Sequence, residues 1–225
     1  MDSDTARTLI VQLESSLSNA PQPLSGNAAQ PTTDDWAPTG LIDIENEWRY
    51  SWMHLDGIAF TAPFFDQTLA LIKKSPANQH KIASCSTLEF LTAEAANLDC
   101  LPPDAFIFHV SRCGSTLLSQ LLSTYPGNIV LSETPLFDDL LRLPHRFTSF
   151  GQDFAENAFA AALRFMGRKR TGREQHLFVK TDCWHVFFYP VIRRLFPNTP
   201  ILLLYRNPAE VLRSQQKIRG IQSRR

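Results

Sequence analysis

Short apolar runs alternate with longer amphipathic stretches from about residue 101 onward. The amphipathic stretches repeat their apolar residues with the period of a helix, whereas the apolar runs have the length and composition of strands buried on both faces. This alternation predicts an α/β fold, in which a parallel sheet has helices on both faces. We expect the strands over residues 106–110, 129–132, 177–180 and 201–205. We expect the helices over residues 115–124, 136–142, 153–166 and 185–196, with a kink or late start at Pro190 and a further helix from Pro208.

The first hundred residues have a less regular pattern. Aromatic residues alternate with polar ones at Trp48, Tyr50 and Trp52, which predicts a strand, and Asp56-Gly57 predicts a hairpin turn from which residues 58–61 return. Helices are expected over residues 64–74 and 88–96, the second capped by Ser86 or Thr87. Earlier in the chain, residues 5–17 can form a short amphipathic helix, and residues 18–40 have the composition of a flexible linker.

The chain therefore divides into three expected parts. Residues 1–44 are a disordered or weakly helical tail and linker, residues 45–100 are a lead-in layer of a hairpin and helices, and residues 101–225 are the α/β domain. We assign no chemistry to the first two parts, because aromatic residues such as Trp48 more often cover a sheet than bind a ligand.

Composition narrows the classes of function. The 225 residues are 44% apolar and 20% charged with a formal net charge of zero, so no global field attracts nucleic acid or a membrane. No apolar run approaches the ~18 residues of a membrane span, and the acidic N-terminus is unlike a signal peptide. The cysteines form no C-x-x-C pair, so neither a disulfide framework nor a zinc site is indicated, and we expect thiols in a cytoplasmic protein. They are Cys85, Cys100, Cys113 and Cys183.

The turn after the first predicted strand, residues 111–116, carries small and polar residues and leads into a helix. Such a turn can bind an anion, because free backbone N–H groups and the positive end of the helix dipole face it. Gly114 lets the backbone come close to a ligand, and Ser115 and Thr116 add hydroxyl donors. Arg112 adds a charged fork of donors that suits phosphate or sulfate oxygens.

This turn differs from the loop of nucleotide hydrolases. That motif, G-x-x-x-x-G-K-[ST], needs a lysine just before the hydroxyl residue, and here Gly114 stands before Ser115. Cys113, in the same turn, is either a reactive thiol near a helix N-terminus or a small residue that fills space in the loop, and we favour the second interpretation.

Charged residues also follow the other three predicted strands. Glu133 follows the second strand, Lys180 and Asp182 follow the third, and Arg206 follows the fourth. Ligands of open parallel sheets bind outside the carboxyl ends of the strands, so we expect these side chains to line one site.

Two segments, in this order, resemble sulfotransferases that use 3′-phosphoadenosine-5′-phosphosulfate (PAPS). Ser-Arg-Cys-Gly-Ser-Thr-Leu-Leu, from Ser111, resembles their 5′-phosphosulfate loop. Leu-Leu-Leu-Tyr-Arg-Asn-Pro-Ala-Glu-Val-Leu-Arg-Ser, which ends at Ser214, resembles their 3′-phosphate-binding segment. The resemblance covers about residues 101–217, and residues 45–100 only loosely, and it implies a P-loop-like sulfotransferase architecture.

The resemblance also implies how the nucleotide binds. Arg206 and Ser214 match the residues that hold the 3′-phosphate. The local sequence fits this role, since Asn207 can cap the following helix and Pro208 can occupy its first position. The residues that match the 5′-phosphosulfate loop are Arg112, Cys113, Gly114, Ser115 and Thr116.

For catalysis, the resemblance gives Lys180 contact with the bridging oxygen or sulfuryl group. Glu133 matches the base of the protein-tyrosine branch, and Asp182 falls where the cytosolic small-molecule branch has a histidine base. We prefer Glu133 with Asp182 as second choice, and we expect Glu133 to be partly buried, because an exposed glutamate is too weak a base. Arg112 and Lys180 would neutralise charge on the leaving oxygen, so no metal is expected.

Sulfotransferases continue beyond the 3′-phosphate helix, so the resemblance leads us to expect a chain that is truncated after it. Three functions follow: a PAPS-dependent sulfotransferase acting on a hydroxyl or amine, a non-catalytic nucleotide-binding or interaction remnant, and a P-loop kinase. The absence of the loop lysine and of an acidic Mg²⁺ site disfavours the kinase. The expected partners are the nucleotide and an acceptor, with no nucleic acid or membrane.

Overall fold

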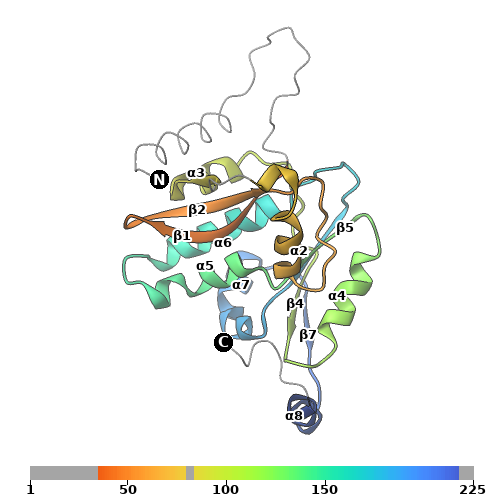
Figure 1. Cartoon of the computed structure of the whole chain (residues 1–225). Coiled ribbons are helices and arrows are strands. Elements are labelled where there is room, and N and C mark those ends of the chain that lie inside the picture. The colour runs from red at the N-terminus through yellow and green to blue at the C-terminus, as the bar shows by residue number, and fades with distance from the viewer. Residues whose placement is uncertain (1–34, 80–83, 218–225) are drawn as a thin grey trace.

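The computed structural model describes residues 35–79 and 84–217 (Figure 1). The helix expected over residues 5–17 lies outside these ranges. The elements are β1 (Trp36–Ile44), β2 (Glu47–His54), α2 (Phe65–Ile72), the 3-10 helix η2 (Pro76–Asn78), β3 (Ser84–Ser86), α3 (Leu88–Ala95), β4 (Ala105–His109), α4 (Ser115–Ser123), β5 (Asn128–Ser132), α5 (Pro135–Arg146), α6 (Gln152–Met166), β6 (His176–Lys180), the 3-10 helix η3 (Cys183–Phe188), α7 (Tyr189–Leu195), β7 (Ile201–Leu204) and α8 (Pro208–Lys217).

A four-stranded parallel sheet with the order β5-β6-β4-β7 forms the centre of the α/β part. Figure 1 shows α4 on one side of this sheet and α5, α6 and α7 on the other. The fold class predicted from the alternating pattern is therefore confirmed, and each of the four predicted strands lies within a residue of its expected bounds. The helix expected over 185–196 is divided into η3 and α7, and Pro190 lies in the first turn of α7, which is the late start that was predicted.

The first hundred residues form a second, antiparallel sheet with the order β1-β2-β3. The expectation of a linker throughout residues 1–44 is wrong for β1, which pairs with β2 along its whole length. The sequence did not predict this strand because it contains Pro38 and Gly40, and both residue types are rare in strands. The two residues flank a shift in register on a strand at the edge of the sheet, where a missing N–H group and a local bulge are tolerated.

The hairpin turn was also predicted at the wrong place. β2 pairs with β1 before it, through a turn at Glu45 and Asn46, whose φ angles are 54° and 67°. Two successive residues with positive φ are the hallmark of the tight turns that suit the twist of a hairpin. Asp56 and Gly57 do form a turn with positive φ, but residues 58–61 do not form the predicted returning strand. Positive φ therefore occurs at both sites, and the position of β1 decides which turn closes a hairpin.

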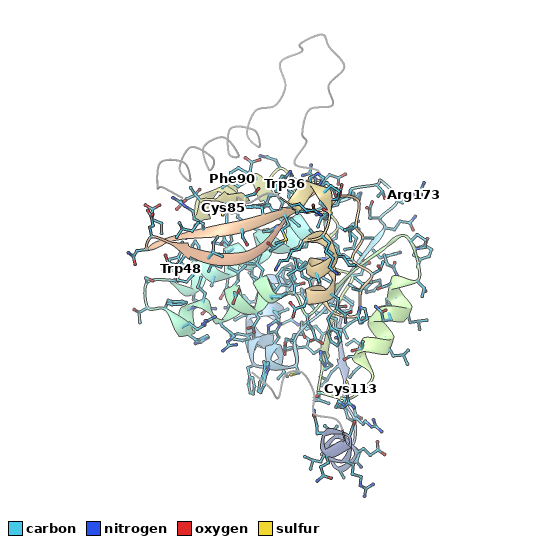
Figure 2. The ribbon with its side chains drawn as sticks, in the orientation of Figure 1. Trp36, Trp48, Cys85, Phe90, Cys113 and Arg173 are labelled. Atoms are coloured by element: carbon cyan, nitrogen blue, oxygen red, sulfur yellow. The ribbon has the colours of Figure 1, made fainter. Side chains whose placement is uncertain are left out.

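The two sheets share one hydrophobic core. Trp52 of β2 packs edge-on against Phe90 of α3 and Phe165 of α6, and its indole N–H donates to the Ser86 hydroxyl at 2.8 Å. Trp48, at one end of the β1–β2 hairpin in Figure 2, packs against Phe147, which follows α5. The lead-in layer is thus packed on the helices that cover one face of the parallel sheet.

Candidate functional site

The carboxyl ends of β4, β5 and β6 bring three side chains into contact: His109, Glu133 and Lys180. The Lys180 ammonium group contacts Oε1 of Glu133, and Nε2 of His109 lies 3.4 Å from the same oxygen. The Lys180 side chain is fully buried, and the ring of Phe64 covers its ammonium group at 5.1 Å. A buried ammonium group needs such an anionic partner, because it has lost its hydration.

Glu133 is held as a carboxylate. Its side chain is only 12% exposed, so the expected partial burial is present. Burial alone would raise the pKa of Glu133, but the hydrogen bond from His109 and the charge of Lys180 outweigh it, and the pKa is lowered from its ordinary value. Burial therefore does not strengthen this group as a base while Lys180 remains its partner.

Strained backbone surrounds the same strand ends. Glu133 has a φ of 54° and Arg112 a φ of 63°, both in the left-handed region that residues with a side chain rarely adopt. The Glu133 N–H donates to the Lys180 carbonyl at 2.9 Å, which extends the pairing of β5 and β6 by one residue. This bond fixes the carboxylate beside Lys180.

The turn after β4 has the geometry expected of an anion-binding loop. Gly114, with a φ of 92°, is the residue from which α4 begins, and its carbonyl accepts the first helical hydrogen bond, from Leu118. Ser115 is buried and Thr116 half-buried in the first turn of α4. Cys113 is half-buried, and Figure 2 shows it at the end of the sheet, close to α8. The helix N-terminus and both hydroxyl residues thus lie at the carboxyl end of β4.

Direct hydrogen bonds join this turn to α8. Nε of Arg112 donates to the Ser214 hydroxyl at 2.8 Å, although the two residues are 102 positions apart in the sequence. The Gln215 amide donates to the Ser111 hydroxyl at 2.8 Å, and Nη1 of Arg206 lies 3.4 Å from the Arg112 carbonyl oxygen. The two segments predicted to bind the two ends of the nucleotide therefore contact each other.

The start of α8 agrees with the local sequence prediction. The Asn207 side chain accepts a hydrogen bond from the Ala209 N–H at 2.9 Å, and Pro208 is the first helical residue. Nε of Arg206 donates to Oε2 of Glu210 at 2.7 Å, so part of its guanidinium group already has an anionic partner. Its remaining N–H groups lie next to the turn that carries Arg112.

The Asp182 side chain caps a helix. Its carboxylate accepts a hydrogen bond from the Trp184 N–H at 3.2 Å and caps η3, and its own N–H donates to Nδ1 of His185 at 3.2 Å. The next residue, Cys183, has its pKa raised to about 12 by burial and by the negative charges of Asp182 and Glu133, so it remains a neutral thiol. These contacts place Asp182 at the edge of the cluster around Glu133.

A model of the sulfotransferase family matches residues 103–225. The chain belongs to the sulfotransferase family. This confirms the resemblance on which the residue roles were predicted, and the matched segment contains all four strand ends. No curated protein and no solved structure matches the chain.

No group of three or more His, Cys, Asp or Glu side chains in residues 35–79 and 84–217 is arranged to hold a metal ion. No helix in these ranges has the length and apolar character needed to cross a membrane.

The sequence did not predict that His109 belongs to this cluster. His109 stands within an apolar run, where a histidine is usually a core residue, and nothing in its spacing links it to Glu133 or Lys180. The order of the strands provides the link, because β4 lies beside β6, and β6 lies beside β5.

Proposed function

We propose that this sulfotransferase moves a sulfuryl group from PAPS to a hydroxyl or amine acceptor. The observation that carries the proposal is the hydrogen bond between Arg112 and Ser214. It brings together two segments that resemble the 5′-phosphosulfate loop and the 3′-phosphate-binding segment, so one nucleotide with phosphates at both positions could span them.

The donor would be held by charge and by backbone N–H groups. Arg112, Ser115, Thr116 and the N–H groups that follow Gly114 would bind the 5′-phosphosulfate, because a helix N-terminus and a guanidinium group both favour an anion. The Arg112–Ser214 bond leaves the terminal nitrogens of the guanidinium group for this task.

The 3′-phosphate would bind to Arg206 and Ser214 on the other side of the same turn. The bond from Arg206 to Glu210 uses Nε, and the two terminal nitrogens point towards the turn or remain available. A phosphate at this place would compete with Glu210 for one guanidinium group.

The chemical step would be an in-line displacement. The acceptor oxygen or nitrogen attacks sulfur, the bond between sulfur and the bridging phosphate oxygen breaks, and 3′-phosphoadenosine-5′-phosphate leaves. Lys180 would neutralise the charge on the leaving oxygen, an interaction worth about 3–4 kcal/mol of barrier for a well-placed donor. Glu133 would take the acceptor proton, which typically adds about 10²–10⁴-fold.

The Lys180 ammonium group cannot contact the bridging oxygen of the sulfuryl donor and the Glu133 carboxylate equally closely at the same time. Once its ammonium group turns to the bridging oxygen, the pKa of Glu133 rises, and the carboxylate becomes a better proton acceptor. Binding of the donor would thus activate the base. Asp182 remains the second candidate for the base, but its capping bonds to η3 disfavour it.

Titration calorimetry with 3′-phosphoadenosine-5′-phosphate tests the proposal. A charged hydrogen bond to phosphate is worth about 1.5–3 kcal/mol, so Arg112→Ala and Arg206→Ala should each weaken binding about ten-fold or more. Glu210→Gln should act in the opposite direction, because it removes a competing carboxylate. Arg146→Ala serves as a matched control, since this arginine lies on α5 in an exposed ion pair with Asp139.

Each outcome separates the candidate functions. Binding that both site variants weaken and the control does not would support the proposal and justify an acceptor screen. Tighter binding of ATP with Mg²⁺ would favour a kinase instead. Binding without turnover of PAPS on any acceptor would favour a nucleotide-binding protein, and a folded wild type that binds neither nucleotide would contradict the proposal.

A further inference from the structure

His109 makes contacts that a core histidine does not need. Its side chain is almost fully buried, and Nε2 lies 2.9 Å from the Thr181 carbonyl oxygen. A carbonyl oxygen only accepts hydrogen bonds, so this closer of the two backbone contacts favours the tautomer with its hydrogen on Nε2. The same nitrogen lies 3.4 Å from Oε1 of Glu133, and Nδ1 lies 3.3 Å from the carbonyl oxygen of Val110. The ring is thus oriented by backbone groups so that Nε2 contacts both the Thr181 carbonyl oxygen and the Glu133 carboxylate.

Lys180 and His109 contact the carboxylate in different ways. Lys180 holds it through a charge at the end of a flexible side chain, whereas His109 holds it through a ring fixed on β4. Under the proposed function Lys180 turns to the donor, and Glu133 then loses its nearest positive charge. A carboxylate with an exposed fraction of only 12% is costly to leave without a donor.

We propose that His109 is a positioning residue that keeps the Glu133 carboxylate in place while Lys180 serves the sulfuryl donor. This role rests on the proposed function. His109 does not touch the reacting atoms, and it acts through Glu133, whose oxygen it orients towards the acceptor. The strained backbone of Glu133 and the buried Lys180 side chain complete the cluster, so each of the three strand ends contributes one group.

The first test needs no nucleotide. Because the pKa of Glu133 is lowered in the folded state, this group adds stability above its ordinary pKa, and the stability is lost as the pH falls. His109→Phe keeps a ring of similar size but removes the donor. The loss of Tm that it causes should therefore be about 2–4 °C larger at pH 7 than at pH 4.

His109→Phe is also made in a Glu133→Gln background. This distinguishes the coupling between His109 and Glu133 from the titration of other groups. Other titratable groups near the pair are Lys180 on β6 and Asp182 and Cys183 at the start of η3, whereas β7 contributes only apolar residues beside β4. Glu133→Gln changes the environment of Lys180 and Cys183, but His109→Phe is compared with His109 within each background, so these effects cancel. The additional loss of Tm at pH 7 relative to pH 4 should disappear in the Glu133→Gln background. An additional loss that is equal in both backgrounds would overturn the proposal.

Two further variants keep the test decisive. His109→Gln retains an N–H donor and should recover part of the coupling. If His109→Phe does not fold, proton NMR of the wild type still tests the contact, because Glu133→Gln should shift the resonance of the His109 Nε2–H. An unchanged resonance would mean that the two side chains do not interact.

The second test follows protons during binding of 3′-phosphoadenosine-5′-phosphate. Calorimetry in two buffers of different ionisation enthalpy at pH 6.5 should give, for the wild type, only the proton exchange of the nucleotide's own phosphate groups, whose second pKa is about 6. His109→Phe should take up an additional fraction of a proton, because Glu133 then lacks the contacts of Lys180 and of His109, and this additional uptake should vanish when Glu133→Gln is added. Uptake equal to that of the wild type would contradict the role. A wild type that does not bind the nucleotide would count against the proposed function, and the pH comparison would still decide whether His109 holds Glu133.

Discussion

At the scale of single residues, backbone strain is concentrated at the candidate site. Two of the residues with a side chain and a positive φ lie at the carboxyl edge of the parallel sheet: Glu133 directly follows β5, and Arg112 is in the turn after β4. The others in residues 35–79 and 84–217 lie in turns of the lead-in layer: Glu45, Asn46 and Asp56. Such strain persists where the surrounding contacts over-determine it, here the bonds of Arg112 to Ser214 and of Glu133 to Lys180.

Gly114 allows a residue-scale prediction. Its φ of 92° costs an alanine about 1–2 kcal/mol, although an added Cβ would meet no atom within 4 Å. That Cβ would stand in the turn proposed to hold the phosphosulfate, so Gly114→Ala should lower the unfolding free energy and also weaken nucleotide binding by about ten-fold or more. Urea unfolding and calorimetry measure the two effects.

Gly172→Ala is the matched control, because Gly172 has a φ of 74° and also meets no atom within 4 Å. It lies before β6, at the amino ends of the strands, far from the turn. It should cost similar stability and leave nucleotide binding unchanged. Equal loss of binding in both variants would mean that Gly114 matters only for the fold.

The sequence predicted the residues of the site better than their interactions. A charge after each apolar run is visible in the sequence, and the rule for parallel sheets brings those charges to one edge. That Lys180 pairs with Glu133, and that His109 joins them, depends on strand order and on side-chain rotamers, which no local pattern encodes. The catalytic roles of Glu133, Lys180 and Asp182 remain predictions.

At the scale of elements, a hydrogen bond between two side chains connects η3 to α5. Nε2 of the buried His185 lies 3.3 Å from Oδ1 of Asp138, and Nδ1 of the ring accepts from the Asp182 N–H. Since Nδ1 accepts, Nε2 carries the hydrogen and donates to Asp138. This chain of bonds sets where η3 begins, and with it the segment that follows Lys180.

The pH dependence of Asp138→Asn tests this connection. Burial would raise the pKa of Asp138, but the hydrogen bonds from His185 and Arg142 and the charge of Arg142 lower it. Its contribution is therefore present above the ordinary aspartate pKa of about 3.9 and is lost as the pH falls through the lower folded value. We expect Asp138→Asn to cost about 1–3 kcal/mol at pH 7 and progressively less towards pH 3.5, measured by urea unfolding.

Asp99→Asn is the control, because Asp99 forms only an exposed pair with Lys169 at 3.7 Å, and such pairs are worth little. A cost of Asp138→Asn that does not change with pH would show that the carboxylate charge is not what holds η3.

Elements with strong periodicity were predicted well, and those decided by tertiary pairing were not. β4 to β7 are short apolar runs bounded by turns, so their existence and limits follow from the sequence. β1 contains Pro38 and Gly40, which lower its intrinsic propensity, and it is a strand because β2 offers it a partner. α5 continues past its predicted end at residue 142 to Arg146 and includes Pro144, a residue type that rarely occurs inside a helix.

At the scale of the whole molecule, two sheets of opposite type share one core. The three-stranded sheet packs through Trp52 on α3 and α6, and the apolar residues of β5 and β6 belong to the same buried cluster. A continuous core of this kind predicts that residues 35–217 unfold as one cooperative unit, because neither sheet can lose its packing without exposing the other.

Leu131→Ala tests this at a position in β5 that is fully buried and belongs to the parallel sheet. Truncating such a residue costs about 2–5 kcal/mol. Of the four tryptophans, Trp36 and Trp52 lie in β1 and β2, and Trp48 also lies in β2, so fluorescence reports mainly on the other sheet, whereas far-UV circular dichroism reports on both. If the core is continuous, the substitution should move the guanidinium midpoints of both signals equally. A fluorescence midpoint that stays at the wild-type value while the circular dichroism midpoint falls would mean that the three-stranded sheet is stable on its own, and that the lead-in layer only rests on the sulfotransferase domain.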